Sequence, residues 1–162
     1  MLCIKEGKVL HRNTDRPWFG VLHDGSYIIG SAAEYKKVSE ELQTALGGHH
    51  IILKDSKIYD IGFGNEFGYI RHPRTAVGFR EDGTLVLVVV DGRQTALSNG
   101  ASLGDLAGIF KELRCTDALN LDGGGSSTFI IDGGSGSFTT MNSPSDGKLR
   151  KIQNSLLVLL PD

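Results

Sequence analysis

The sequence predicts an α+β fold in which a mixed β-sheet carries two packed helices, built from two duplicated strand–strand–helix–strand units. Three observations favour this class. Short apolar segments alternate with turns, and 22 of the 162 residues are glycine, about twice the usual share of roughly 7%. Two segments have apolar residues at helical spacing. The order of elements in the first half recurs in the second, which predicts a single domain over residues 1–162.

The first half begins with a short strand, predicted over residues 7–12. Residues 17–32 predict a hairpin, because an Asp-Gly turn separates two apolar runs. Residues 34–46 predict an amphipathic helix, because apolar residues return every three or four positions and Gly-Gly follows. Residues 49–60 predict a further strand and turn.

The second half repeats this order. Residues 73–92 predict a hairpin with an Asp-Gly turn, and residues 102–114 predict a helix with Ser102 as its N-cap. Residues 117–131 predict a strand, a loop and a strand, and residues 154–160 predict a final strand. This order predicts that both helices lie on one face of a shared sheet.

The duplication indicates where function lies, since structural features are expected in both copies and functional features in one. The Asp-Gly turns occur twice. The polar cluster Asp91–Arg93 and the loop Asn120–Ser127 occur only in the second copy. Aligning the halves places Asp55 over Asp122. We therefore expect the functional site in the second copy.

Composition excludes several classes of function. The net charge of −2 gives no basic field for a nucleic acid. The sequence contains no run of 18 apolar residues, so no membrane-spanning helix is predicted. Cys3 and Cys115 are too far apart in sequence for a metal motif or a disulfide framework. The first residues lack a secretory signal. This predicts either a cytoplasmic protein or the mature part of a longer one, and the oligomeric state stays open.

Asp91 and Arg93 follow the most apolar strand of the chain, Leu85–Val90. A carboxylate and a guanidinium at a strand end are typical of a binding or catalytic site. The alternative is a strand-terminal turn with a local ion pair.

The second cluster is the loop with the sequence "NLDGGGSS". Asn120 and Asp122 are predicted to point to one face of a strand. Glycines let backbone N–H groups approach an anion closely, and serines add hydroxyl donors. The alternative is a tight turn with solvated serines. The predicted ligand-binding residues of this loop are Asn120, Gly123, Gly124, Gly125, Ser126 and Ser127.

Arg74 and Thr75 open the second hairpin. The guanidinium of an arginine matches phosphate oxygens, so Arg74 is a candidate phosphate ligand. The neighbouring His72 is more often structural than catalytic, and residues 143–155 either close over the site or form a solvated loop. No set of His, Cys and carboxylate residues has metal-ligand spacing, so no metal and no cofactor is predicted.

The motifs "HPRTAVGF", "VVVDGR", "GASLGDLAGIFKELRCTDALNLDGGGSSTFI" and "PSDG…R…NSLLV" together resemble the phosphodiester glycosidase domain. The resemblance runs from about residue 73 to 160. Residues 1–60 fit the weaker upstream pattern of the family. Members usually carry a further upstream segment with an Asn-Gly-Phe-Phe-like motif, so we expect a truncated member whose site is partly missing. Members often act outside the cytoplasm.

The resemblance implies cleavage of a sugar–phosphate diester at the glycosidic bond, releasing free sugar and a phosphomonoester. It implies that Arg74 and Arg93 bind the phosphate and that Asp122 is the first catalytic carboxylate. Asp91 is then the second carboxylate or orients Arg93, and Asn120 positions Asp122 or a sugar hydroxyl. Two alternatives stay open: a non-catalytic module that binds carbohydrate or cell wall, and a phosphoesterase that cleaves the P–O bond.

Overall fold

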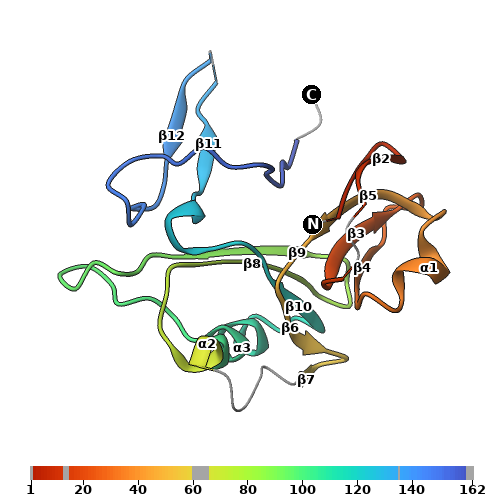
Figure 1. The fold of residues 1–162 in the computed structure, drawn as a ribbon, viewed down its shortest axis with the longest axis horizontal. Helices are drawn as coiled ribbons and strands as arrows, with labels where there is room; N and C mark the ends of the chain where they lie inside the picture. Colours follow the sequence, from red (N-terminus) through yellow and green to blue (C-terminus); the bar gives the residue numbers. More distant parts are fainter. Residues whose placement is uncertain (1, 13–14, 60–65, 135, 160–162) are drawn as a thin grey trace.

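Figure 1 shows the computed structural model of the chain, which describes residues 2–12, 15–59, 66–134 and 136–159. Two five-stranded sheets and one two-stranded sheet form the molecule, and the strand pairings in this described part are antiparallel. The first half comprises β1 (Cys3–Lys5), β2 (Lys8–His11), β3 (Trp18–Leu22), β4 (Tyr27–Gly30), α1 (Tyr35–Val38), β5 (Leu42–Gly47), β6 (His50–Lys54) and β7 (Lys57–Ile58). The remainder comprises α2 (Glu66–Tyr69), β8 (Arg74–Phe79), β9 (Leu85–Val90), α3 (Leu103–Glu112), β10 (Asp117–Asn120), the 3₁₀ turn η1 (Gly124–Ser126), β11 (Ile130–Asp132) and β12 (Phe138–Thr140).

The expected α+β class, with two helices packed on one mixed sheet, is wrong. The chain is mainly β, and α3 is the only helix of the described residues longer than four residues. The expected strand–strand–helix–strand unit is found in the second half, as β8–β9–α3–β10, but in the first half the helix expected over residues 34–46 is only the single turn α1 followed by strand β5. The two large sheets instead share a strand order, β2-β1-β5-β3-β4 and β7-β6-β10-β8-β9. In this arrangement β5 corresponds to β10, so the alignment of Asp55 with Asp122 is wrong as well.

The helix expected over residues 34–46 fails because burial on both faces of a strand imitates helical spacing. After the single turn of α1, β5 lies between β1 and β3 and hydrogen-bonds to both. Leu42, Ala45 and Leu46 are all buried there. A central strand covered on both faces does not alternate between apolar and polar residues. Its apolar residues therefore fitted the helical pattern by coincidence.

Other expected elements are confirmed. The two Asp-Gly hairpins are β3–β4 and β8–β9, and each turn has the same contact. The Asp24 carboxylate accepts from the Ser26 N–H, and the Asp82 carboxylate accepts from the Thr84 N–H, both at 2.9 Å. Ser102 is the N-cap of α3, as the sequence predicts.

The second sheet lies between α3 and the first sheet. One core cluster joins α3 to this sheet through residues such as Leu106, Phe110 and Ala118. Another joins the opposite face to the first sheet through Phe19, Val77 and Leu119. Because neighbouring side chains of a strand point to opposite faces, β10 contributes to both clusters. Its end is therefore firmly placed between the layers.

The C-terminal region leaves the sheets. The β11–β12 hairpin projects away from the two large sheets, at the top of Figure 1. The final strand expected over residues 154–160 is not found: residues 154–159 form no strand, and residue 160 lies outside the described residues. Leu156 packs against the core between the sheets. Within the described part of the chain, no helix is long and apolar enough to cross a membrane.

Candidate active site

The glycine-rich loop after β10 is fixed against the start of β8. The Leu121 N–H donates to the Thr75 carbonyl at 2.8 Å, and the Gly124 N–H donates to the Pro73 carbonyl at 2.9 Å. A Cβ at Gly123 would lie 2.9 Å from the Pro73 oxygen, and Gly124 has a φ of +63°. These two positions therefore require glycine for close approach and for backbone conformation.

A cavity of about 210 Å³ lies beside this loop. Residues from both halves of the chain line it. The lining contains seven of the eleven residues that the sequence predicts for the site: Arg74, Arg93, Asn120, Asp122, Gly123, Gly124 and Gly125. His49, His72 and Arg150 also line the cavity. The other four predicted residues, Asp91, Thr75, Ser126 and Ser127, lie outside the lining.

Arg74 is a buried cation held in a fixed position. Only 2% of the residue is exposed. Its Nε donates to the Ala101 carbonyl at 2.9 Å, and its Nη2 donates to the Ile70 carbonyl at 3.0 Å. Burial, and then the charge of Arg93, lower the pKa of Arg74, but an arginine stays protonated at any physiological pH. The cavity therefore contains a permanent positive charge.

Arg93 lies on the other side of the loop, with a left-handed φ of +57°. A Cβ at Gly124 would lie 3.2 Å from Arg93 Nη1, so the guanidinium covers this glycine. Its Nη2 lies 3.3 Å from His72 Nδ1. Burial, then Arg74 and Arg93, lower the pKa of His72, so at neutral pH its Nδ1 can accept from Arg93. His72 thus orients a cation rather than adding one.

Arg150 reaches the cavity from the C-terminal region. Its Nε donates to Asp146 Oδ2 at 3.0 Å, four residues earlier. This ion pair lies directly on Gly125, because a Cβ at Gly125 would come within 2.5 Å of Asp146 Oδ1. Of the two alternatives for residues 143–155, closure over the site is the one that these contacts favour.

Asp122 and Asn120 offer polar atoms from the end of β10. Asp122 is exposed, and its Oδ1 accepts from the Gly123 N–H at 3.0 Å. Asn120 is buried, and its Nδ2 donates to the Leu121 carbonyl at 2.9 Å. Asn120 Oδ1 has no hydrogen-bond partner among the described residues, and the same is true of the Thr75 and Ser127 hydroxyl groups. Such buried groups gain stability when they find a partner.

Asp91 organises the neighbouring chain. Its carboxylate accepts from Asn142 Nδ2 at 2.9 Å and from the Ser143 N–H at 3.0 Å. Asn142 Nδ2 also donates to the Ser127 carbonyl at 3.0 Å, and Gln94 Nε2 donates to the Ser143 carbonyl at 2.7 Å. Asp91 therefore ties the segment before Asp146 and Arg150 to the glycine-rich loop. Its expected catalytic role stays a prediction.

His49 lines the cavity, although no sequence pattern identifies it as a candidate. It lies between β5 and β6, and its Nδ1 is 2.8 Å from His50 Nδ1. Burial first, then His50 and Arg16, lower its pKa, while the Asp122 carboxylate acts in the opposite direction. No short motif surrounds it in the sequence. The antiparallel pairing of β6 with β10 is what brings His49 to the cavity, and that pairing is a property of the tertiary structure.

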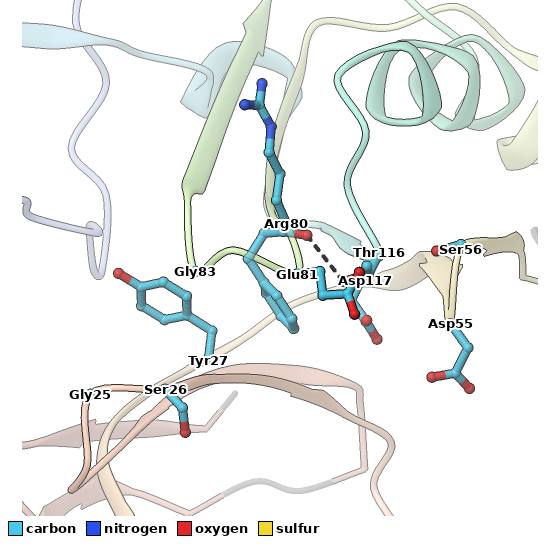
Figure 2. A pocket seen from close by; sticks show the side chains of 11 residues that line it. Gly25, Ser26, Tyr27, Asp55, Ser56, Arg80, Glu81, Gly83, Thr116 and Asp117 are labelled. Atoms are coloured by element: carbon cyan, nitrogen blue, oxygen red, sulfur yellow. Dashed lines mark hydrogen bonds between the residues drawn. The ribbon is translucent and has the colours of Figure 1, made fainter.

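A larger hollow, of about 540 Å³, lies between the two Asp-Gly turns. Figure 2 shows its residues, with Arg80 extending away from Tyr27 and Asp117. Arg80 Nε donates to the Leu113 carbonyl at 2.7 Å, and Asp117 forms an ion pair with Lys54 at 3.0 Å. Two of its charged groups, Arg80 and Asp117, are thus committed to the fold, so we place the candidate site at the glycine-rich loop. In the described part of the chain, no group of three His, Cys, Asp or Glu residues could hold a metal ion.

Comparisons with known proteins identify the family of the chain. A profile of the phosphodiester glycosidase family matches residues 2–159. The N-acetylglucosamine-1-phosphodiester alpha-N-acetylglucosaminidase of Bos taurus is 31% identical over 143 residues, which cover 79% of this chain and 26% of that protein. The SPbeta prophage-derived uncharacterized protein YomE of Bacillus subtilis is 40% identical over 93 residues, covering 57% of this chain and 14% of that protein.

One solved structure is similar over most of the chain. The zebrafish N-acetylglucosamine-1-phosphodiester alpha-N-acetylglucosaminidase catalytic domain, auto-inhibited by its pro-peptide, has a TM-score of 0.71 and 26% identity. The match covers 90% of this chain and 50% of the zebrafish chain. The present chain thus spans about half the length of that structure. The resemblance found in the motifs is confirmed by the profile: the chain belongs to the phosphodiester glycosidase family.

Proposed function

We propose that this chain hydrolyses the glycosidic bond of a sugar 1-phosphodiester, releasing free sugar and a phosphomonoester. The observation that carries the proposal is the meeting of three arginines, a glycine-rich loop and the Asp122 carboxylate around one cavity. A phosphodiester carries one negative charge, and its phosphate gains a second as the bond to the sugar breaks. Arginines bind the more highly charged species more tightly, so they favour the transition state over the substrate.

The three arginines would divide the work of holding the phosphate. Arg74 is buried and held by two carbonyls, so it can bind an anion with little loss of side-chain freedom. Arg93 covers Gly124, and Arg150 lies on Gly125. The Gly125 N–H, in the 3₁₀ turn η1, would be the backbone donor of the loop. A phosphate already leaves as a stable anion, so it needs little help from an acid.

Asp122 would act on the sugar. An oxocarbenium-like transition state carries positive charge near the anomeric carbon, and a carboxylate stabilises that charge, attacks the carbon or activates water. Asn120 would position Asp122 or a sugar hydroxyl, and Ser127, Ser126 and Thr75 would add hydrogen bonds around the loop. For Asp91, the contacts with Asn142 and Ser143 favour a positioning role.

The sugar class follows from the relatives only as a proposal. The names of the Bos taurus and zebrafish proteins specify N-acetylglucosamine in an alpha-linked phosphodiester. N-acetylglucosamine 1-phosphodiesters are therefore the first substrates to test, together with simpler aryl glycosyl phosphates. We propose no metal and no cofactor for the reaction.

The decisive experiment measures sugar release from these substrates by the wild type and by Asp122→Asn. We expect the variant to lose turnover, while its free energy of unfolding changes by less than about 0.5 kcal/mol, because Asp122 is exposed. The asparagine oxygen can still accept from Gly123. Near-normal turnover in Asp122→Asn would remove this carboxylate from the mechanism.

Two other outcomes would replace the proposal. Hydrolysis in ¹⁸O-labelled water puts the label in the sugar if the glycosidic bond is cleaved. Label in the phosphate would identify a phosphoesterase instead. Binding of the substrate by the folded chain without any turnover would identify a carbohydrate-binding module.

A further inference from the structure

His49 reaches the cavity from a backbone that is packed against β10. Its N–H donates to the Asn120 carbonyl at 2.8 Å, and the preceding Gly48 N–H donates to the Pro17 carbonyl at 2.7 Å. A Cβ at Gly48 would lie 2.5 Å from Leu119 Cδ2. The connection between the two sheets is therefore held against the end of β10, directly before the glycine-rich loop. A side chain on this backbone keeps a fixed position relative to Asp122.

The rings of His49 and His50 form a stacked pair, with centroids 4.6 Å apart and planes at 29°. Their Nδ1 atoms are 2.8 Å apart, so one proton lies between them: two N–H groups would collide, and two lone pairs would repel. Both rings cannot be imidazolium at once in this arrangement. Because Nδ1 of His49 is engaged with His50, a proton that His49 exchanges with a ligand passes through Nε2.

Burial and the surrounding charges set the protonation state of the pair at neutral pH. Burial, His50, Arg16 and Arg74 lower the pKa of His49, and the Asp122 carboxylate raises it. Burial, Arg74 and Arg16 lower the pKa of His50. Both rings are thus neutral at neutral pH, because the Asp122 carboxylate offsets only part of the lowering of the His49 pKa. This fits the tautomer in which His49 donates Nδ1–H to His50 and keeps a lone pair on Nε2.

We propose that His49 is a further catalytic residue, the general base that takes a proton from the attacking water at Nε2. The proposal rests on the proposed glycosidase function. The water oxygen forms a bond to the anomeric carbon while the bond from that carbon to the phosphate oxygen breaks, and the electron pair leaves with the phosphate. The second pKa of a phosphomonoester is about 6, so the imidazolium can return its proton to the product or to water.

This assignment gives His49 and Asp122 separate roles. Asp122 stabilises the positive charge that develops on the sugar and on His49, and the neutral imidazole removes the proton. Direct attack by water on the side opposite the leaving group inverts the anomeric carbon. Inversion in the first-formed sugar is therefore required by this assignment, and retention would exclude direct attack by water.

The test compares His49→Gln with His23→Gln, an exposed histidine outside the cavity lining. We expect kcat of His49→Gln to fall by about 100-fold or more, with KM little changed and the acidic limb of the kcat–pH profile lost. Added imidazole should partly restore His49→Ala, and NMR of the product should show inversion. The role would be overturned if His49→Gln kept more than about a tenth of the wild-type kcat and an unchanged acidic limb. A product with retained configuration would also overturn it.

A second measurement does not depend on turnover. ¹⁵N NMR of the histidine rings distinguishes a protonated nitrogen from one with a lone pair. We expect a lone pair on His49 Nε2 at neutral pH, and a proton on Nε2 in the neutral ring overturns the assignment whatever the assay gives. Wild type without sugar release overturns the glycosidase function and the role of His49 together, whereas an active wild type with an unaffected His49→Gln overturns the role alone.

Discussion

At the scale of single residues, the three glycines of the loop are required for three different reasons. A side chain at Gly123 would meet the Pro73 carbonyl, a backbone group that cannot move aside. Gly124 has a positive φ. Gly125 has neither constraint, and a side chain there would meet the flexible ends of Asp146 and Arg150. The sequence shows a triplet, but the structure separates its members: Gly124 lies against Arg93, and Gly125 lies against the Asp146–Arg150 pair.

This difference predicts opposite effects for two similar substitutions. Gly125→Ala should displace the Asp146–Arg150 pair and lower kcat/KM by about tenfold, with a loss of stability of about 1 kcal/mol or less because side chains can move. Gly123→Ala should destabilise the fold by more, since its Cβ meets backbone. Urea unfolding and the sugar-release assay measure both. Equal losses of stability in the two variants would contradict this account.

Arg74 and Asp91 show what residue-level reasoning could reach. Both were selected from local sequence, as a guanidinium opening one strand and a carboxylate ending the next. Arg74 does line the cavity. Asp91 instead holds Asn142 and Ser143, which are 51 and 52 residues away. No local pattern indicates a contact at that separation.

At the scale of elements, α3 and the segment 34–46 show which helix signals are reliable. In α3, the Ser102 hydroxyl accepts from the Asp105 N–H at 3.0 Å, and the Asp105 carboxylate accepts from the Ser102 N–H at 2.8 Å. This reciprocal cap stabilises the helix start. The N-cap of α1, Glu34, makes no such side-chain bond to the helix. Apolar spacing is present in both segments, and the Glu34 carboxylate accepts from the Ser31 N–H at 2.7 Å. Only the complete reciprocal cap of α3 therefore distinguishes the two segments.

Two substitutions test the local stability of α3. Ser102→Ala should destabilise the protein by about 1 kcal/mol, because an orphan N–H of the first turn loses its acceptor. Gly108→Ala should stabilise it by about 0.5–1 kcal/mol, because a Cβ there meets no atom within 4 Å and alanine loses less entropy than glycine in a helix. Chemical denaturation measures both. A destabilising Gly108→Ala would indicate a contact that this packing does not contain.

At the scale of the whole molecule, the site depends on the meeting of the two sheets. β6 follows the first sheet in sequence but belongs to the second, where it lies next to β10. This pairing places His49 beside a loop that lies more than 70 residues later in the chain. The same pairing partly buries His49 and His50 near the buried Arg74, so titration of the site and stability of the fold are linked.

The histidines give stability a predicted dependence on pH. The pKa values of His49, His50 and His72 are all lowered, first by burial, from an unfolded value of 6.5. The unfolded chain therefore binds more protons than the folded one as pH falls below about 6.5, and the free energy of unfolding should decrease between about pH 7 and pH 5. Carboxylates with lowered pKa values, such as Asp105, stay ionised in this range and do not produce the decrease.

Thermal unfolding across this range measures the slope. A double variant, His49→Asn with His50→Asn, removes two of the three groups and should have a flatter profile than the wild type. A double variant as steep as the wild type would show that other groups carry the dependence.

The sequence by itself determined the hairpin turns, the capped helix α3, the family and the composition of the glycine-rich loop. These features depend on local chemistry: an Asp-Gly turn, a reciprocal cap, or glycine where a side chain cannot fit. Only the tertiary structure decided that residues 42–47 form a strand, that the molecule consists of separate antiparallel sheets, and that His49 and Arg150 reach the cavity. Those outcomes depend on pairing between distant segments, because hydrogen bonding and burial on both faces of a sheet outweigh the local apolar pattern.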